Sequence, residues 1–198
     1  MILRTDRLIA LSVALGLLLL PVLGSSARAD SHGSAAPATS QSQPAKSVYN
    51  PAIGSATGLP LPRFVSLRAD AVNLRVGPGD QYPILWIYHR VGLPVEILRE
   101  YDVWRLVVDS DGTKGWMHEA TLVGTRHFVI NGKQPATLYR QPSDGASPAA
   151  QLMPGVVGLL ERCDPPSDWC RVHAGHVGGW LRREDFWGVL PDEKIPAK

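Results

Sequence analysis

The stretch WRLVVDSDGTKGWMH at 104–118 decides the fold, because a second version of it, WCRVHAGHVGGWLR, occurs at 169–182. Both versions contain Trp, two residues, Val, a polar gap that includes glycine, and then Gly-Trp. Each version predicts a β-hairpin, in which a short apolar strand leads through a turn into a second strand. Two copies of one hairpin predict two copies of one domain.

The segments around the hairpins recur in the same order, at spacings of 63 to 65 residues. The first copy opens with a predicted strand at 71–76, a turn, and a loop at 81–88 without clear periodicity, and a further strand is predicted at 95–98. ATLY at 136–139 and GVVGLL at 155–160 repeat the two strands. A spacing that varies by one residue at loops is typical of two homologous domains, since solenoid repeats are shorter and stricter.

The first residues have the pattern of a secretory signal peptide at 1–29. Arg4 and Arg7 precede an apolar run at 8–23, and Ala27-Arg28-Ala29 supplies a small-residue cleavage site. The run is shorter than the roughly 18 to 20 residues that a membrane-spanning helix needs. We therefore expect an exported protein, periplasmic or secreted, whose mature chain has no membrane span.

Composition then divides the remaining chain. Residues 30–62 are rich in Pro, Ser and Ala and poor in large apolar residues, which predicts a disordered linker because little surface can be buried to offset the entropy of ordering. We place the two domains at 63–126 and 127–190, and a C-terminal tail at 191–198. All six tryptophans lie between Trp86 and Trp187.

Charge excludes one class of partner. Cleavage after Ala29 removes three arginines and one aspartate, which leaves 17 basic and 17 acidic residues. The slight basicity of the whole chain therefore belongs to the leader, and no run of Lys or Arg is interleaved with aromatic residues. We expect no nucleic-acid partner.

Three motifs together resemble the bacterial SH3 domain family. These are the opening NLRVGPGDQYPIL at 73–85, the middle strand GLPVEILRE at 92–100, and the W-x-x-V…GW hairpin. The second copy departs from the pattern at its opening, TLYRQPSDGASPAAQL at 137–152. The resemblance implies an all-β fold of two tandem SH3-like small β-barrels, and a non-catalytic role in binding cell-wall peptides or protein partners.

Cys163 and Cys170 are the only cysteines, and they flank a short turn. An even pair in an exported chain is expected to be oxidised, and antiparallel strands joined by a short turn bring such positions to the separation that a disulfide needs. A free catalytic thiol and a redox or metal site are the alternatives.

Catalytic and metal sites are weakly indicated. Cys170 and His173 lie three positions apart on one predicted strand, so they face opposite sides and the base could not reach the thiol. No G-x-S-x-G motif is present. His173-x-x-His176 lacks further ligands at metal spacing, and Asp109-Ser110-Asp111-Gly112 lacks the glutamate that a calcium loop requires. We expect neither catalysis, nor a metal, nor a cofactor; His89, His118 and His127 are scattered and indicate nothing.

The tryptophans are the candidate ligand contacts. Strand periodicity places Trp104 and Val107 on opposite faces, as it does Trp169 and Val172, so a core valine implies an outward tryptophan. The predicted site combines five aromatic residues that suit stacking on a peptide or a sugar ring: Trp104, Tyr101, Tyr82, Trp86 and Trp116. The alternatives are that tryptophan covers the end of a small barrel or seals the interface between the domains; we favour a ligand for Trp104 and the neighbouring domain for Trp169.

We therefore expect an exported, non-catalytic binding protein that recognises cell-envelope material, either a peptidoglycan peptide or an envelope protein. A structural or dimerisation module is one alternative, and an accessory to a cell-wall hydrolase is the other. Small β-barrels host many functions, so the fold itself does not name the ligand.

Overall fold

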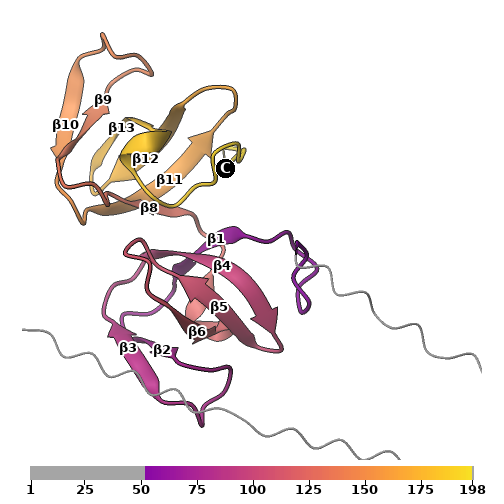
Figure 1. Ribbon diagram of the computed structural model, residues 1–198. Helices are drawn as coiled ribbons and strands as arrows, with labels where there is room; N and C mark the ends of the chain where they lie inside the picture. Colours follow the sequence, from indigo (N-terminus) through magenta and orange to yellow (C-terminus); the bar gives the residue numbers. More distant parts are fainter. Residues whose placement is uncertain (1–51, 198) are drawn as a thin grey trace, which may run out of the picture. The chain divides into compact units, whose positions relative to one another are not determined.

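The computed structural model of the protein describes residues 52–197, which form two antiparallel sheets (Figure 1). The predicted signal peptide and residues 30–51 of the predicted linker lie outside the described residues. The first sheet has the strand order β3-β2-β6-β5-β4-β1-β7 and contains β1 (Arg63–Leu67), β2 (Val72–Arg75), β3 (Ile84–Tyr88), β4 (Pro94–Tyr101), β5 (Trp104–Val108), β6 (Lys114–His118) and β7 (Leu122–Val123).

The second sheet repeats this arrangement in the order β10-β9-β13-β12-β11-β8. Its strands are β8 (His127–Val129), β9 (Ala136–Tyr139), β10 (Pro148–Leu152), β11 (Val157–Cys163), β12 (Trp169–Ala174) and β13 (Val177–Arg182). The helices of the described residues are two 3-10 turns, η1 (Glu119–Thr121) and η2 (Arg183–Asp185). In this part of the chain no helix has the length and apolar character to cross a bilayer. The predicted all-β class is confirmed.

Each sheet encloses its own apolar core, and alternation along the strands selects its members. On β2, Val72 and Leu74 are fully buried while Asn73 between them is exposed. Val107 and Val172, the valines shared by the two hairpins, are 1% and 0% exposed and belong to the separate clusters. Both hairpins therefore direct valine inward, as the sequence predicts.

The glycine of each Gly-Trp pair is required by close approach of a neighbouring strand. A Cβ at Gly115 would meet the Leu74 side chain and, at 2.8 Å, the carbonyl oxygen of Arg75. A Cβ at Gly179 would meet the equivalent side chain, Leu138, and a backbone carbonyl oxygen at 2.6 Å. Backbone atoms cannot yield cheaply, so only glycine allows β2 and β9 to pair with β6 and β13.

Residues 81–88 differ from expectation, because their second half forms the strand β3 rather than loop. β3 pairs antiparallel with β2, with Trp86 opposite Leu74 and Ile87 opposite Asn73. Ile84, Leu85, Trp86 and Ile87 are all exposed, so the strand has no alternating pattern that periodicity could detect.

The DSDG segment after β5 is a turn stabilised by its own aspartate. The Asp109 carboxylate accepts hydrogen bonds from the backbone N–H of Asp111 at 3.0 Å and of Thr113 at 2.8 Å, and from the Tyr88 hydroxyl at 2.6 Å. Burial of the hydroxyl is the main cause that raises the pKa of Tyr88 above its usual range, and the hydrogen bond to Asp109 raises it further. These hydrogen bonds give Asp109 a structural role in the turn.

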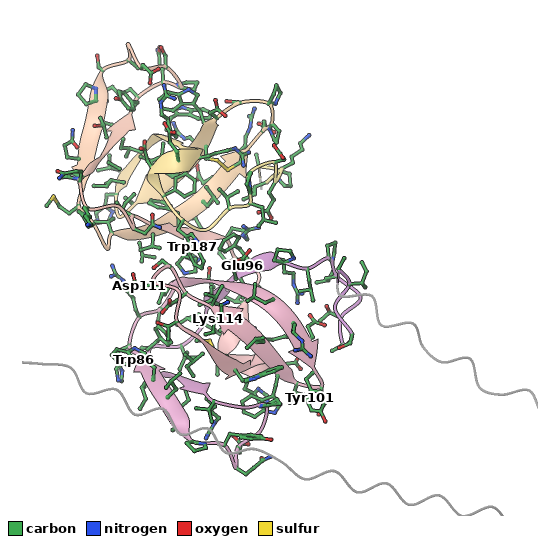
Figure 2. The ribbon with its side chains drawn as sticks, viewed as in Figure 1. Trp86, Glu96, Tyr101, Asp111, Lys114 and Trp187 are labelled. Carbon is green, nitrogen blue, oxygen red and sulfur yellow. A yellow bond between two sulfur atoms is a disulfide. The ribbon has the colours of Figure 1, made fainter. Side chains whose placement is uncertain are left out.

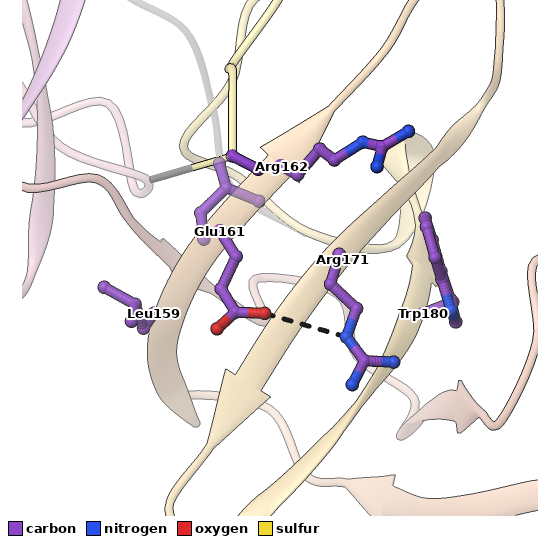
Figure 3. A pocket seen from close by; sticks show the side chains of 7 residues that line it. Leu159, Glu161, Arg162, Arg171 and Trp180 are labelled. Atoms are coloured by element: carbon purple, nitrogen blue, oxygen red, sulfur yellow. Dashed lines mark ion pairs between the residues drawn. The ribbon is translucent and has the colours of Figure 1, made fainter.

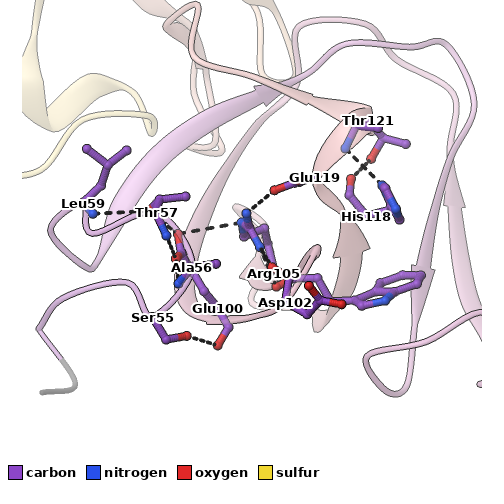
Figure 4. A network of polar contacts seen from close by, with 12 residues as sticks. Ser55, Ala56, Thr57, Leu59, Glu100, Asp102, Arg105, His118, Glu119 and Thr121 are labelled. Atoms are coloured by element: carbon purple, nitrogen blue, oxygen red, sulfur yellow. Dashed lines mark hydrogen bonds and ion pairs between the residues drawn. The ribbon is translucent and has the colours of Figure 1, made fainter. Parts of the chain in front are cut away.

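Residues 52–62, the described end of the predicted linker, are ordered against the first domain. Gly54 and Gly58 close a turn through a 2.9 Å backbone hydrogen bond, and Ile53 forms a bridge with Pro60. Three residues of this turn, Ser55, Ala56 and Thr57, bond to Glu100 of β4 (Figure 4). Disorder was expected from the scarcity of apolar residues, and polar contacts replace apolar burial here.

Both sheets belong to one compact unit, and an aromatic contact joins them. The rings of Phe64 on β1 and Trp187 meet edge to face, with centroids 4.7 Å apart. The Ser66 hydroxyl and Nδ1 of His127 lie 2.9 Å apart. The tryptophan at the junction is therefore Trp187 and not Trp169.

Candidate functional site

The first domain contains a groove of about 210 Å³ over Trp104, which we call the Trp104 groove. Its lining comes from the residue before β2, from β2 and the turn after it, and from β5, β6 and η1. The residues that line it are Ala71, Asn73, Arg75, Asp80, Trp104, His118 and Thr121.

Trp104 forms the apolar part of the groove. It is not a member of the first domain's core cluster, but it is buried, with 7% of its surface exposed, and not the exposed tryptophan that the sequence predicts. Its ring meets His118, its register partner on β6, edge to face with centroids 5.3 Å apart. The ring is therefore held in one orientation with little freedom to lose when a ligand binds.

Polar groups surround this ring. Nδ1 of His118 accepts the backbone N–H of Ala120 at 3.1 Å, which places the proton of the neutral imidazole on Nε2. Arg75 donates to the backbone oxygens of Asp80 and Tyr82 at 3.0 and 2.8 Å and pairs with the Asp80 carboxylate at 3.3 Å. The Asp80 side chain is 85% exposed, so most of its capacity to accept hydrogen bonds remains available.

At the equivalent position of the second domain, Trp169 contacts two side chains of its own domain and is more exposed than Trp104. Trp169 meets Tyr139 edge to face, with centroids 5.4 Å apart, and the guanidinium of Arg182 lies 5.0 Å from the Trp169 centroid. Register places Arg182 opposite Trp169, as His118 stands opposite Trp104. Nε of Arg182 donates a 2.9 Å hydrogen bond to the Asp144 carboxylate, which holds the guanidinium in place. Trp169 therefore packs within its own domain, which corrects the expected contact with the neighbouring one.

The five aromatic residues predicted as one site do not gather in one place. Only Trp104 lines the groove. Trp86 on β3 and Tyr101 at the end of β4 are each 60% exposed and lie apart (Figure 2). Tyr82 packs against Gly77, and Trp116 is half-buried on β6, opposite Leu106.

The polar groups of the groove were not singled out from the sequence. Asn73 is the exposed residue of the alternating strand β2, and His118 follows the Gly-Trp pair by two positions. His118 could have been found from hairpin register, because a residue opposite Trp104 must lie on the same face.

A second concave surface, of about 390 Å³, lies on the outer face of β11, β12 and β13 (Figure 3). Arg171 stands between Glu161, 3.6 Å from its Nε, and the ring of Trp180, whose centroid lies 5.8 Å from its Cζ. Glu161 also lies 3.3 Å from His173. The charged groups here compensate one another, which leaves the Trp104 groove as the stronger candidate.

The predicted disulfide is present between Cys163 and Cys170, whose Cα atoms are 4.4 Å apart. Both cysteines are fully buried and face each other across β11 and β12. Among the described residues, no group of three or more His, Cys, Asp or Glu side chains has the arrangement of a metal site.

The same hairpin position in the first domain holds a buried charged pair, Glu100 and Arg105. Burial would by itself raise the pKa of Glu100, but hydrogen bonds from Thr57, Arg63 and Ala56 outweigh it and lower the pKa to about 2. Nε of Arg105 lies 3.7 Å from the same carboxylate. Glu100 is therefore ionised and structural, and does not line the Trp104 groove.

Comparison with solved structures finds distant likenesses. These are NlpC2 from Trichomonas vaginalis (12% identity, 65% of this chain, 48% of that chain, TM-score 0.29), NlpC1 from the same organism (11%, 69%, 49%, 0.29) and an NlpC/P60 family protein from Bacillus cereus (17%, 67%, 58%, 0.27). The chain spans about half the length of these proteins. No curated protein sequence matches it significantly.

The sequence profile of the bacterial SH3 domain matches residues 68–124 and 132–188. These two segments make up more than half of the chain and correspond to the two sheets. The chain belongs to the bacterial SH3 domain family and contains two tandem copies of the domain.

Proposed function

We propose that this chain is an exported, non-catalytic binding protein that recognises cell-envelope material, a peptidoglycan peptide or an envelope protein, through the Trp104 groove. The difference between the two domains carries the proposal. In the first domain a groove lined by Asn73, Asp80 and His118 lies beside Trp104, whereas the equivalent Trp169 contacts Tyr139 and Arg182 of its own domain. The first domain is thus the binding domain and the second supports it.

The lining of the groove suits a short peptide segment. Trp104 offers an apolar ring, Asn73 an amide, and His118 an N–H donor, while Asp80 places a carboxylate at the exposed rim. An amino group on the ligand would complete the contacts of Asp80, and an apolar side chain would contact the indole. The disulfide of the second domain supports an oxidising, extracytoplasmic location.

We expect the double variant Asn73→Ala/Asp80→Ala to bind purified cell-wall sacculi about tenfold more weakly than the wild type. Two lost polar contacts of about 0.5 to 1.5 kcal/mol each sum to about 1 to 3 kcal/mol, a range that includes the 1.4 kcal/mol corresponding to a factor of ten. Both side chains are exposed, so folding should be unchanged. Retention on sacculi, measured across a range of protein concentrations, checks the prediction.

The chain supplies its own control for this experiment. Thr137→Ala/Asp168→Ala removes the residue equivalent to Asn73 and an exposed carboxylate of the second domain, leaves Asp144 bound to Arg182, and should bind like the wild type. Equal binding by the two double variants would remove the groove from the proposal. Degradation of peptidoglycan by the purified protein would instead favour a hydrolase function.

A further inference from the structure

β3 is an edge strand that presents four large apolar side chains to solvent. It ends the strand order of the first sheet and pairs on one side with β2. Ile84, Leu85, Trp86 and Ile87 are 45%, 50%, 60% and 45% exposed, so no segment within residues 52–197 covers either face of the strand. Four consecutive exposed apolar residues on an edge are unusual, since an open edge is a template for another strand.

The second domain shows that the fold does not require this sequence. β10 holds the same place, at the end of its sheet and paired with β9, and both strands carry a register shift at the same point. Register aligns ILWIY of β3 with PAAQL of β10, so Trp86 corresponds to Ala150 and Ile87 to Gln151. A proline, alanines and a glutamine suffice for the fold, and the large apolar residues of β3 therefore have another purpose.

β3 also lacks the usual protection of an edge. Natural edge strands carry charged residues or prolines that prevent pairing with another chain. β10 begins with Pro148, whereas no charged residue lies between Gln81 and Tyr88 and the only proline, Pro83, precedes the strand.

We propose that β3 forms a homodimer interface, in which the β3 strands of two copies pair antiparallel about a two-fold axis. In such a pair Trp86 of one copy lies opposite Trp86 of the other, and Leu85 lies opposite Ile87, so apolar residues meet apolar residues along the strand. The uncharged strand creates no like-charge contact with itself, and a two-fold pairing closes with two copies. These features make the strand complementary to itself, so a second copy is the occupant that we propose.

The proposal is independent of the groove. None of the four apolar residues lines the Trp104 groove, so dimerisation leaves the groove's lining unchanged. It would bring two binding domains together and thereby strengthen attachment to a repetitive surface such as a cell wall.

Sedimentation equilibrium of the purified full chain tests the interface. We expect the weight-average mass of the wild type to rise towards that of a dimer with increasing concentration. Ile87→Lys should weaken dimerisation at least tenfold, because the charge is placed on the pairing strand. Gln151→Lys adds the same charge at the equivalent exposed position of β10 and should dimerise like the wild type.

Amide hydrogen exchange at low and high protein concentration locates the interface and verifies that both variants are folded. The amides of β3 should gain protection at high concentration in the wild type and in Gln151→Lys, while those of β10 should not change. A wild type that remains monomeric overturns the proposal. So does a dimer that persists in Ile87→Lys, or one that leaves the β3 amides unprotected.

Discussion

Replacing Glu100 with glutamine is expected to lower the free energy of unfolding of the first domain by about 3 kcal/mol, the low end of the cost of breaking a buried charged pair. The carboxylate side chain has no exposed surface and accepts hydrogen bonds from Thr57, Ala56 and Arg63 at 2.6 to 2.9 Å. Glutamine cannot accept all of these bonds, and it leaves Arg63 and the buried Arg105 without their negative partner.

The same residue predicts a specific response to acid. The folded-state pKa of about 2 lies below the ordinary value of 4.5, so ionised Glu100 contributes stability that is fully present above pH 4.5 and is lost as pH falls towards 2. That difference corresponds to about 3 kcal/mol. The wild type should therefore lose this stability between pH 4.5 and 2, whereas Glu100→Gln should lack this part of the acid response.

Urea unfolding at several pH values, with amide exchange of β4 and β5 to isolate the first domain, measures both effects. Glu119→Gln is the matched control, because Glu119 contacts the same Arg105 but its side chain is 47% exposed. It should cost less than about 1 kcal/mol, as exposed pairs do. The assigned role of Glu100 fails if the two variants are equally stable, or if Glu100→Gln keeps the acid response of the wild type.

The loss of Glu100 should also detach the ordered turn before β1. The backbone N–H groups of Ala56 and Thr57 bond to the carboxylate itself, while Ser55 bonds to the Glu100 carbonyl, which the substitution retains. We therefore expect residues 55–57 to exchange amide hydrogens faster in Glu100→Gln than in the wild type.

The fold could be predicted because its signals are local and occur twice. Strand alternation predicts that Val107 and Val172 point into the core, and both are buried. The glycine of each Gly-Trp pair is required because a neighbouring strand approaches closely. The disulfide could be predicted from the short spacing of the two cysteines and from the expected export of the chain. Signals of this kind lie within one hairpin, where residues near in sequence are near in space.

The candidate site could be predicted only in part, because it joins elements that are distant in sequence. Strand alternation predicts that Trp104 and Val107 face opposite sides, but it does not show which side chains lie around Trp104. Asn73 and His118 reach it from β2 and β6. Trp86 was misleading because β3 has no alternation to reveal that it is an edge strand. The ordered turn at 52–62 depends on hydrogen bonds to Glu100, which lies 43 to 45 positions away. The composition of the turn itself does not predict these bonds.

Register shows that the two domains stabilise one position by different chemistry. Glu100 stands opposite Arg105 and Cys163 opposite Cys170, at the same point of the equivalent hairpins. Each position also anchors an end of the described chain. Glu100 bonds to the turn before β1, and Cys163 exchanges two 2.9 Å backbone hydrogen bonds with Ile195. The disulfide therefore stabilises the hairpin of the second domain at the position where the buried charged pair stabilises that of the first.

Reduction of the disulfide is accordingly expected to lower the stability of the second domain alone. Cys163 and Cys170 are seven positions apart, and the loop-entropy relation gives about 2.5 kcal/mol for a closed loop of this length. Urea unfolding with and without reductant measures the loss, and amide exchange of β11 and β12 assigns it to the second domain. The first domain contains no cysteine and should be unaffected.

The double variant Cys163→Ala/Cys170→Ala separates the covalent bond from side effects of the reductant. It should match the reduced wild type in stability and show no further response to reductant. The buried sulfurs are inaccessible in the native protein, so thiols must be titrated after denaturation without reductant, where none should react. Two reactive thiols under those conditions would show that the bond is absent. Ile195 bonds to the backbone of Cys163, so the contact of the C-terminal segment should survive the alanine substitutions. The turn before β1 bonds to the Glu100 side chain, so its contact should be lost in Glu100→Gln.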